Sequence, residues 1–286
     1  MAEVASRAGV HGATRTVGII GWPVTHSLSP AIHNAAFAAL GLDWVYVPLP
    51  VAPDALGAAL AGLASLGFAG ANVTMPHKAE CARSVDSRSD DADRLEAVNT
   101  VVVTPEGLRG ENTDAPGFER FLQRDAGFEP NGRTALIYGA GGAARATALA
   151  LARGGLAQLT VAVRDRARGA GVARAIEGFD TRINVVAIAD AANVSADLVV
   201  NATPIGQAGD TPPTPPFEPQ MLVVDLLYHP VLTPLQTRAR AAGAAAFGGL
   251  GLLLHQAALS FELWTGSPAP LDVMSAAALA DLAHPD

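Results

Sequence analysis

The sequence predicts an α/β protein of two domains, each with a mainly parallel sheet covered by helices. At 286 residues, the chain is longer than a single domain usually is. Short apolar runs alternate with amphipathic helical segments, a pattern typical of parallel sheets. The alternation starts again near Thr134, and 50% of the residues are hydrophobic against 16% charged. Both halves can therefore bury a core.

The first half of the chain alternates strands and helices in the order β-α-β-α-β. Glycine closes the first apolar run, and Pro30 opens a helix that Gly41 stops. The predicted elements are a strand at Val17–Gly21, a helix over Ile32–Leu40, a strand at Trp44–Leu49, a helix over Pro53–Leu66 and a strand at Gly70–Val73. Because helices separate the strands, the sheet should be largely parallel.

The second half repeats this alternation and ends in a helical segment. The predicted elements are a strand at Ala135–Tyr138, a helix over Ala143–Arg153, and strands at Leu159–Val163, Ile183–Ile188, Leu198–Asn201 and Leu222–Leu226. Prolines in the run 210–216 exclude a regular helix or a central strand, so this run should be a loop. Beyond Gly251, apolar residues recur with a helical period.

Charge and cysteine content exclude several classes of function. The formal net charge is −8, from 19 Lys plus Arg against 27 Asp plus Glu, which opposes binding to nucleic acid or to an anionic membrane. The single cysteine, Cys81, excludes an internal disulfide and a cysteine-based zinc site. His26, His77 and His255 lack the spacing of zinc ligands, so we expect no metal.

No segment has the pattern of a targeting or membrane-spanning sequence. Residues 1–15 lack an apolar core, so we expect a frayed extension and no secretory signal. Polar residues interrupt the apolar C-terminal stretch before it is long enough to span a membrane. We therefore expect a cytoplasmic protein.

The segment Gly139–Ala144 satisfies the pattern G-x-G-x-x-A. A glycine-rich turn in an alanine-rich chain is the simpler alternative, but the segment follows a strand and opens a helix, as the dinucleotide fingerprint requires. Glycine lets backbone N–H groups at the helix N-terminus approach a pyrophosphate. The second domain is therefore predicted to be a Rossmann-type dinucleotide-binding domain, with contacts from Gly139, Ala140, Gly141, Gly142 and Ala143.

Three short polar segments carry candidate residues for chemistry. Ser27 and Ser29 lie near a predicted helix N-terminus, where they can donate to a carboxylate, although Ser29 could simply cap the helix. Lys78 follows an apolar run; a lysine can deliver the proton that a ketone needs when hydride reduces it. Asp114 is a candidate partner for the ammonium group. Taken singly, Lys78 would be a solvated charge and Asp114 a turn residue.

Together these segments resemble the shikimate dehydrogenase family, in the family's order, over nearly the whole chain after about residue 16. The matching segments are Ser27–Pro30, Asn72–Lys78, Asn112–Asp114, Gly139–Arg145, Gly249–Gly251 and His255–Ala258. The resemblance implies a substrate-binding domain of residues 1–114 and 250–286, with the C-terminal helix returning to it, and a dinucleotide-binding domain of residues 115–249. It also implies a small-molecule substrate and a monomer or homodimer.

The resemblance also implies roles for individual residues. Lys78 and Asp114 are the expected catalytic residues. The expected substrate-binding residues are Ser27, Ser29, Asn72, Thr74, Asn99, Asp114, Tyr228 and Gln256. The simpler alternatives are turn formation for Asn72 and Asn99, a core position for Tyr228 and a helix end for Gln256.

Three positions depart from the common pattern of the family. Glu96 and Ala115 stand where glycine is common, and Leu252 stands where methionine is frequent. Glu96 matters most, because a negative charge that pointed into the site would disfavour an acidic substrate. If Glu96 faces solvent, it changes nothing.

The choice of cofactor depends on the residues after the second strand of the dinucleotide domain. Arg164, Asp165 and Arg166 follow that strand, and no acid occupies its last position, Val163. Arginine pairs with the 2′-phosphate of NADP, whereas an acid on the free 2′-hydroxyl selects NAD. NADP is therefore expected, with NAD left open by Asp165. Thr203 and Gly249 complete the predicted set of cofactor residues.

The leading hypothesis is an NADP-dependent enzyme that reversibly reduces 3-dehydroshikimate to shikimate in the biosynthesis of aromatic amino acids. A close alternative is an NAD-linked quinate/shikimate or aminoshikimate dehydrogenase. A non-catalytic nucleotide sensor with the same fold is a third hypothesis, against which the presence of both Lys78 and Asp114 counts.

Overall fold

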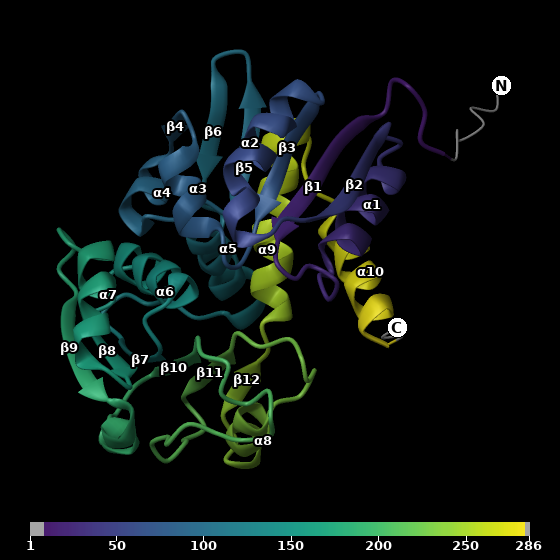
Figure 1. Cartoon of the computed structure of the whole chain (residues 1–286). Helices are drawn as coiled ribbons and strands as arrows, with labels where there is room; N and C mark the ends of the chain where they lie inside the picture. Colours follow the sequence, from purple (N-terminus) through teal and green to yellow (C-terminus); the bar gives the residue numbers. More distant parts are fainter. Residues whose placement is uncertain (1–8, 284–286) are drawn as a thin grey trace. The chain divides into compact units, whose positions relative to one another are not determined.

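The computed structural model describes residues 9–283, which form two compact units (Figure 1). The first unit extends to Thr113 and resumes at Ala257, and the second comprises Asp114–Gln256. Within the described residues, each unit has one six-stranded sheet. The predicted α/β class is confirmed, including the return of the C-terminal segment to the first unit.

The first unit has the strand order β2-β1-β3-β5-β6-β4. Its elements before Thr113 are β1 (Arg15–Gly21), α1 (Ser29–Ala39), β2 (Trp44–Pro50), a 3-10 turn (Pro53–Ala55), α2 (Leu56–Ser65), β3 (Phe68–Val73), α3 (Lys78–Ser84), β4 (Ser87–Arg88), α4 (Asp90–Leu95), β5 (Thr100–Thr104) and β6 (Gly107–Glu111). Most of α9 (Leu250–Thr265) and all of α10 (Leu271–Ala283) also belong to it.

Only part of this first sheet was predicted. The three predicted strands are confirmed as β1, β2 and β3, and β1 pairs in parallel with both neighbours. Strands β4, β5 and β6 were not predicted, and β5 runs antiparallel to β3 and β6. A tight turn after Thr104 joins β5 to β6, so no helical crossover separates them and no β-α alternation marks them.

The two faces of the first sheet pack against different helices. On one face, α2 and α3 cover apolar residues that include Ala71 and Val73 of β3. On the other face, α1 and α9 contribute to an aromatic cluster with Tyr46 of β2. Because side chains alternate along a strand, Asn72 points to this second face, between Ala71 and Val73.

The second unit has the fully parallel strand order β12-β11-β10-β7-β8-β9. Its elements are α5 (Asp114–Phe121), a π-helical turn (Leu122–Ala126), β7 (Thr134–Tyr138), α6 (Gly142–Arg153), β8 (Gln158–Val163), a 3-10 turn (Arg166–Arg168), α7 (Gly169–Ala175), β9 (Arg182–Ala187), a 3-10 turn (Ile188–Asn193), β10 (Leu198–Asn201), β11 (Leu222–Asp225), α8 (Pro234–Ala241), β12 (Ala245–Phe247) and the start of α9. The predicted strands and the helix over 143–153 are confirmed; α7, α8 and β12 were missed.

This strand order creates a switch point between β7 and β10. The chain leaves β7 toward β8 and β9, then returns to β10 and continues the other way. Ligands of such sheets bind at the carboxyl ends of the strands beside the switch point. The segment following β7 is the glycine-rich loop, and the segment following β10 begins with Ala202 and Thr203.

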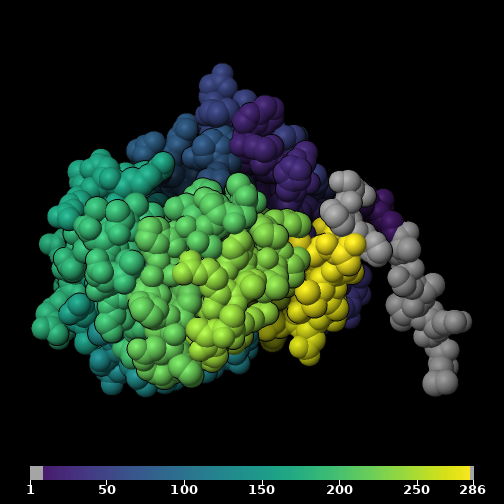
Figure 2. Space-filling view, turned by 90° about the horizontal axis from the view of Figure 1, so that it is seen from below, coloured from purple at the N-terminus to yellow at the C-terminus, as the bar shows by residue number. Residues whose placement is uncertain are grey.

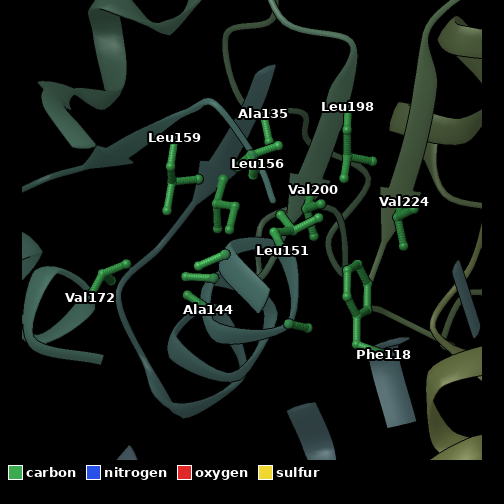
Figure 3. Close-up of a cluster of buried hydrophobic side chains, with 14 of the residues drawn as sticks. Phe118, Ala135, Ala144, Leu151, Leu156, Leu159, Val172, Leu198, Val200 and Val224 are labelled. Atoms are coloured by element: carbon green, nitrogen blue, oxygen red, sulfur yellow. The ribbon is translucent and has the colours of Figure 1, made fainter. Parts of the chain in front are cut away.

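The core of the second unit lies between α6 and one face of this sheet. Figure 3 shows Ala144 and Leu151 of α6 beside Ala135, Leu198 and Val200 of the strands. Alanines on α6 let the helix approach the sheet closely, and Leu151 is fully buried there. In the space-filling view, the second unit presents a continuous packed face (Figure 2).

The expectation of a frayed N-terminus is wrong from His11 onward. The His11 imidazole lies 3.2 Å from a carboxylate oxygen of Asp43, and the Thr14 hydroxyl donates to the same carboxylate at 2.8 Å. Arg15 starts β1, with its guanidinium 4.2 Å from the centre of the Trp44 ring. These contacts anchor the segment to the start of β2. The rest of the expectation, for residues 1–8, lies outside the described residues.

Two further properties follow from the described part of the chain. From residue 9 to residue 283, no helix is both long enough and apolar enough to cross a membrane. In the same range, no group of three or more His, Cys, Asp or Glu side chains is arranged to hold a metal ion.

Candidate functional site

The two candidate carboxylate-binding serines lie at the start of α1. Leu28 occupies the N-cap position of α1, and no side chain caps the helix, so Ser29 is not the cap. The Ser27 hydroxyl accepts a hydrogen bond from the backbone N–H of Ser29 at 3.3 Å. Ser29 is buried, and its side chain is hydrogen-bonded to Tyr46. Both serines thus lie at the N-terminal end of α1.

Lys78 is the first residue of α3 and follows a turn that several hydrogen bonds fix in place. The turn follows β3, and its Thr74 N–H donates to the carbonyl of Ile20 at 2.8 Å. His77 occupies the N-cap position of α3, and its Nε2 lies 2.7 Å from the carbonyl oxygen of Val51. Since a carbonyl only accepts, the ring proton is on Nε2. The carbonyl of Lys78 itself accepts from Val98 N–H at 2.9 Å. Lys78 is half-buried, and these hydrogen bonds fix the backbone on which it lies.

Asn99 directly precedes β5 and bonds to the segment before α5. Its Nδ2 donates to the Thr113 hydroxyl at 2.9 Å, and its Oδ1 accepts from Thr113 N–H at 2.8 Å. Asn112, in the same segment, donates to the carbonyl of Ala97 at 2.9 Å. The predicted polar residues of these two segments are thus brought together inside the first unit.

Asn72 is also buried, and its amide is used within the protein. Its Oδ1 accepts from the Tyr46 hydroxyl at 2.8 Å. Its Nδ2 lies within hydrogen-bonding distance of the Asn99 carbonyl, the Thr100 hydroxyl and the Ser260 hydroxyl. Burial raises the pKa of Tyr46, so its hydroxyl keeps its proton and donates. Asn72 therefore connects Tyr46, the partner of Ser29, with the segment that contains Asn99.

Glu96 does not point into this region. It caps the C-terminus of α4 in the left-handed conformation, with φ of 49°, and its side chain is exposed. Glycine is favoured in this conformation because it has no Cβ. Because the Glu96 side chain is exposed, we expect its negative charge not to disfavour an acidic substrate.

Asp114 and Gln256 belong to the second unit. Asp114 begins α5, and Gln256 lies on α9, where its Nε2 donates to the carbonyl of Leu253 at 2.9 Å. The two helices meet at Gly117, where a Cβ would lie 2.9 Å from the backbone nitrogen of Gln256. Glycine at this position thus sets the approach of α5 to α9. His255, next to Gln256, bonds to Asp125 at 3.1 Å and is structural.

The glycine-rich loop of the second unit fits a dinucleotide pyrophosphate. Gly139 has φ of 102°, and a Cβ there would lie 3.0 Å from the Thr203 side chain. Gly141 is the N-cap of α6, with no side-chain cap, and a Cβ on Gly141 or Gly142 would meet nothing within 4 Å. The space beside these two glycines at the N-terminus of α6 is therefore open, and a phosphate needs such access to bind the first N–H groups of a helix.

Two buried polar residues that the sequence analysis missed support this loop. Asn201 accepts from the N–H and the hydroxyl of Thr203, at 3.1 and 2.6 Å. Its amide also donates to Asp225 at 3.0 Å, and Asp225 accepts from the Thr233 hydroxyl at 2.7 Å. Burial raises the pKa of the Asp225 carboxyl group. Both residues end apolar strands, a polar-after-apolar signal that was visible in the sequence.

Tyr228 and Gly249 follow this network along the chain. Tyr228 is half-buried, and burial raises its pKa. A Cβ on Gly249 would lie 2.1 Å from the Leu226 carbonyl oxygen, so only glycine fits there. The backbone at Gly249 is therefore closely constrained.

The candidate 2′-phosphate residues follow β8. Arg164, Asp165 and Arg166 are all exposed. The Asp165 carboxylate accepts from the N–H of Ala167 at 3.0 Å and so caps the short 3-10 turn Arg166–Arg168. Arg166 lies 3.5 Å from the carboxylate of Asp190. Asp165 thus has a local structural role, and the Arg164 guanidinium stands directly after the strand.

Comparisons with known proteins identify the family. Residues 19–101 match the family model described as the shikimate dehydrogenase substrate binding domain, and residues 249–279 match the shikimate 5'-dehydrogenase C-terminal domain. The chain is 48% identical over 265 residues to the shikimate dehydrogenase (NADP(+)) of Rubrobacter xylanophilus, covering 90% of this chain and 93% of that protein. The chain belongs to the shikimate dehydrogenase family.

Solved structures agree with this membership. The shikimate 5-dehydrogenase of Thermus thermophilus, in complex with NADP(H) and shikimate, matches with a TM-score of 0.83 and 36% identity over 93% of this chain and 99% of that one. The quinate dehydrogenase of Corynebacterium glutamicum, in complex with NAD, matches with a TM-score of 0.86 and 32% identity, over 93% and 99% of the two chains. The shikimate dehydrogenase family therefore includes this chain across nearly its full length.

Proposed function

We propose that this protein is an NADP-dependent shikimate dehydrogenase, which reversibly reduces 3-dehydroshikimate to shikimate in the shikimate pathway of aromatic amino-acid biosynthesis. The observation that carries the proposal is the 48% identity to an NADP(+) shikimate dehydrogenase over 90% of this chain. The hydrogen bonds that fix the turn before Lys78 support it from the structure.

Each unit has its own task in this proposal. The first unit, with the segments around Ser29, Lys78 and Asn99, is the substrate-binding domain. The second unit is the dinucleotide-binding domain, because its strand order and its open α6 N-terminus fit a pyrophosphate. The domain limits proposed from the sequence, residues 1–114 with 250–286 and 115–249, remain part of the proposal.

The residues of the first unit would bind and orient the substrate. Ser27 and Ser29 present hydroxyl groups beside the N-terminus of α1, which favours a carboxylate. Thr74 and Asn99 would bond to ring hydroxyl groups. Asn72 would shape the same region, since its amide holds Tyr46 on one side and contacts Thr100 and Ser260 on the other.

Lys78 and Asp114 would carry the proton transfer. Bound NADPH would supply the hydride to the ring ketone. The Lys78 ammonium group would give a proton to the developing alkoxide during reduction and take it back during oxidation. Asp114 would orient that ammonium group and bind a ring hydroxyl. Tyr228 and Gln256 are further proposed contacts to the substrate.

The cofactor would be held by the second unit alone. The N–H groups at the start of α6 would bind the pyrophosphate, with Gly139 and Thr203 shaping the loop. Arg164, with help from Arg166, would pair with the 2′-phosphate of NADP. Asp165 would not compete for the ribose while it caps the 3-10 turn, which favours NADP over NAD.

An NAD-linked quinate/shikimate or aminoshikimate dehydrogenase is the second candidate. One observation favours it specifically: the family match extends to a quinate dehydrogenase solved with NAD, at 32% identity. Asp165 is the residue that would bind the ribose hydroxyl in this case, after release from its capping role.

Kinetics with two substrates and two cofactors separate these candidates. We expect the highest kcat/KM with shikimate and NADP⁺, and much lower values with quinate or with NAD⁺. A preference for NAD⁺ with quinate would support the second candidate. We also propose a cytoplasmic monomer or homodimer without a nucleic-acid or membrane partner, in keeping with the net charge of −8.

A further inference from the structure

Ser260 lies at the centre of a buried polar cluster in the first unit. The cluster consists of the side chains of Asn72, Asn99, Thr100, Thr113 and Ser260, which are all at most 5% exposed. Ser260 comes from α9, whereas the others come from β3, β5 or the segments beside β5 and β6. Its contacts therefore fasten α9 to the strands that carry the proposed substrate residues.

The Ser260 hydroxyl lies close to polar side chains of Asn72, Thr100 and Thr113. Its Oγ lies 3.0 Å from Asn72 Nδ2, 2.8 Å from Thr100 Oγ1 and 3.3 Å from Thr113 Oγ1. In a buried cluster, losing one hydroxyl leaves its neighbours unsatisfied, and their positions change.

Thr113 links Ser260 to Asn99. The Thr113 hydroxyl accepts from Asn99 Nδ2 at 2.9 Å, and the Thr113 N–H donates to Asn99 Oδ1 at 2.8 Å. Both atoms of the Asn99 amide are therefore oriented by Thr113. Thr113 in turn directly precedes Asp114 in the sequence. A shift of Thr113 would move the Asn99 amide and the backbone that leads to Asp114.

We propose that Ser260 is a positioning residue for substrate binding, which acts through Thr113 on the orientation of the Asn99 amide. The proposal rests on the proposed function, because Asn99 is taken there as a substrate-binding residue. Ser260 itself is fully buried and needs no contact with the substrate. The Ser260 hydroxyl determines how well the protein binds the ring hydroxyl groups of the substrate. It has no part in binding the cofactor.

The same helix provides a matched control. Trp264 lies one turn after Ser260, and its Nε1 donates to the Val101 carbonyl at 3.0 Å. Like Ser260, it is buried and fastens α9 to β5. It makes no hydrogen bond to the polar cluster among the described contacts. Trp264→Phe therefore weakens the attachment of α9 without removing a group from the cluster.

The test compares Ser260→Ala and Trp264→Phe with the wild-type protein. Ser260→Ala should raise KM for shikimate about tenfold and change KM for NADP⁺ less than twofold, since a buried hydrogen bond is lost on the substrate side only. Trp264→Phe should lower the Tm at least as far and leave KM for shikimate nearly unchanged. Equal effects of both variants on KM for shikimate would show a structural role only and overturn the proposal.

A double-mutant cycle with Thr113→Val tests the path through Thr113. If Ser260 acts through Thr113, Ser260→Ala should add little to KM for shikimate in the Thr113→Val protein. Additive effects would overturn this path. If Ser260→Ala does not fold, Ser260→Cys keeps a weaker donor and allows the same comparison.

The outcomes also separate this proposal from the proposed function. A wild-type protein without activity on shikimate with either cofactor would remove the proposed function, and this inference with it. An active wild-type protein whose KM for shikimate is unaltered by Ser260→Ala would remove this inference alone.

Discussion

Replacing His33 should make the stability of the first unit less sensitive to acid. His33 lies on α1, is fully buried, and neither ring nitrogen has a hydrogen-bond partner. Its ring stacks on Tyr46 with centroids 4.5 Å apart, and it lies 5.5 Å from the Trp264 ring. Burial among these aromatic rings lowers the pKa of His33 from 6.5 to about 3.

The lowered pKa fixes the sign and the size of the effect. Between pH 6.5 and about pH 3, the unfolded chain binds a proton at His33 and the folded chain does not. Stability is therefore lost as the pH falls through this range, by about 1.4 kcal/mol for each pH unit well below 6.5. Between pH 7 and pH 5, the loss from His33 alone is about 2 kcal/mol.

His33→Phe keeps a planar ring for the stack and removes the titrating group. Urea unfolding at pH 7 and pH 5, followed by tryptophan fluorescence, reports on the first unit, because Trp22, Trp44 and Trp264 all belong to it. The difference in unfolding free energy between the two pH values should be about 2 kcal/mol smaller in His33→Phe than in the wild type. The exposed His26, changed to Gln, is the control. An identical pH dependence in wild type and His33→Phe would show that burial does not lower the pKa of His33.

Three predictions concern the proposed activity. Lys78→Ala should lower kcat by about 10²–10⁴-fold in steady-state assays, and a variant that keeps most of its kcat would remove Lys78 from the proton transfer. Ser29→Ala should raise KM for shikimate and leave kcat nearly unchanged, because a carboxylate remote from the ketone is bound equally throughout the reaction; a fall in kcat alone would contradict this role. Arg164→Ala should raise KM for NADP⁺ and leave activity with NAD⁺ almost unaltered, whereas a loss with both cofactors would argue against a contact to the 2′-phosphate.

The sequence was sufficient to predict local features of the fold and of the candidate site. The glycine-rich loop was predicted correctly between a strand and a helix, and the positive φ of Gly139 shows why glycine is favoured at the first position of the motif. The strand before the loop, β7, was predicted from an apolar run of the usual length. Such signals depend only on neighbours along the chain.

Features that depend on distant contacts were not predictable. The Ser260 hydroxyl meets Asn72 across 188 positions of the sequence, and a serine in an apolar helix has no pattern that reveals such a contact. The hairpin of β5 and β6 was missed because the Thr104–Gly107 turn lacks a strong turn pair of residues and no helix separates the strands. The left-handed conformation of Glu96 was not predictable either, because glutamate rarely adopts it and only the structure shows it.

The most direct test of the account is the reduction of 3-dehydroshikimate by the purified protein. The decay of NADPH absorbance is recorded after the substrate is added, with a parallel trace for NADH. We expect rapid, substrate-dependent oxidation of NADPH and a much slower reaction with NADH. No oxidation of either nucleotide would contradict the proposed activity, and faster oxidation of NADH would contradict the assignment of NADP as the cofactor.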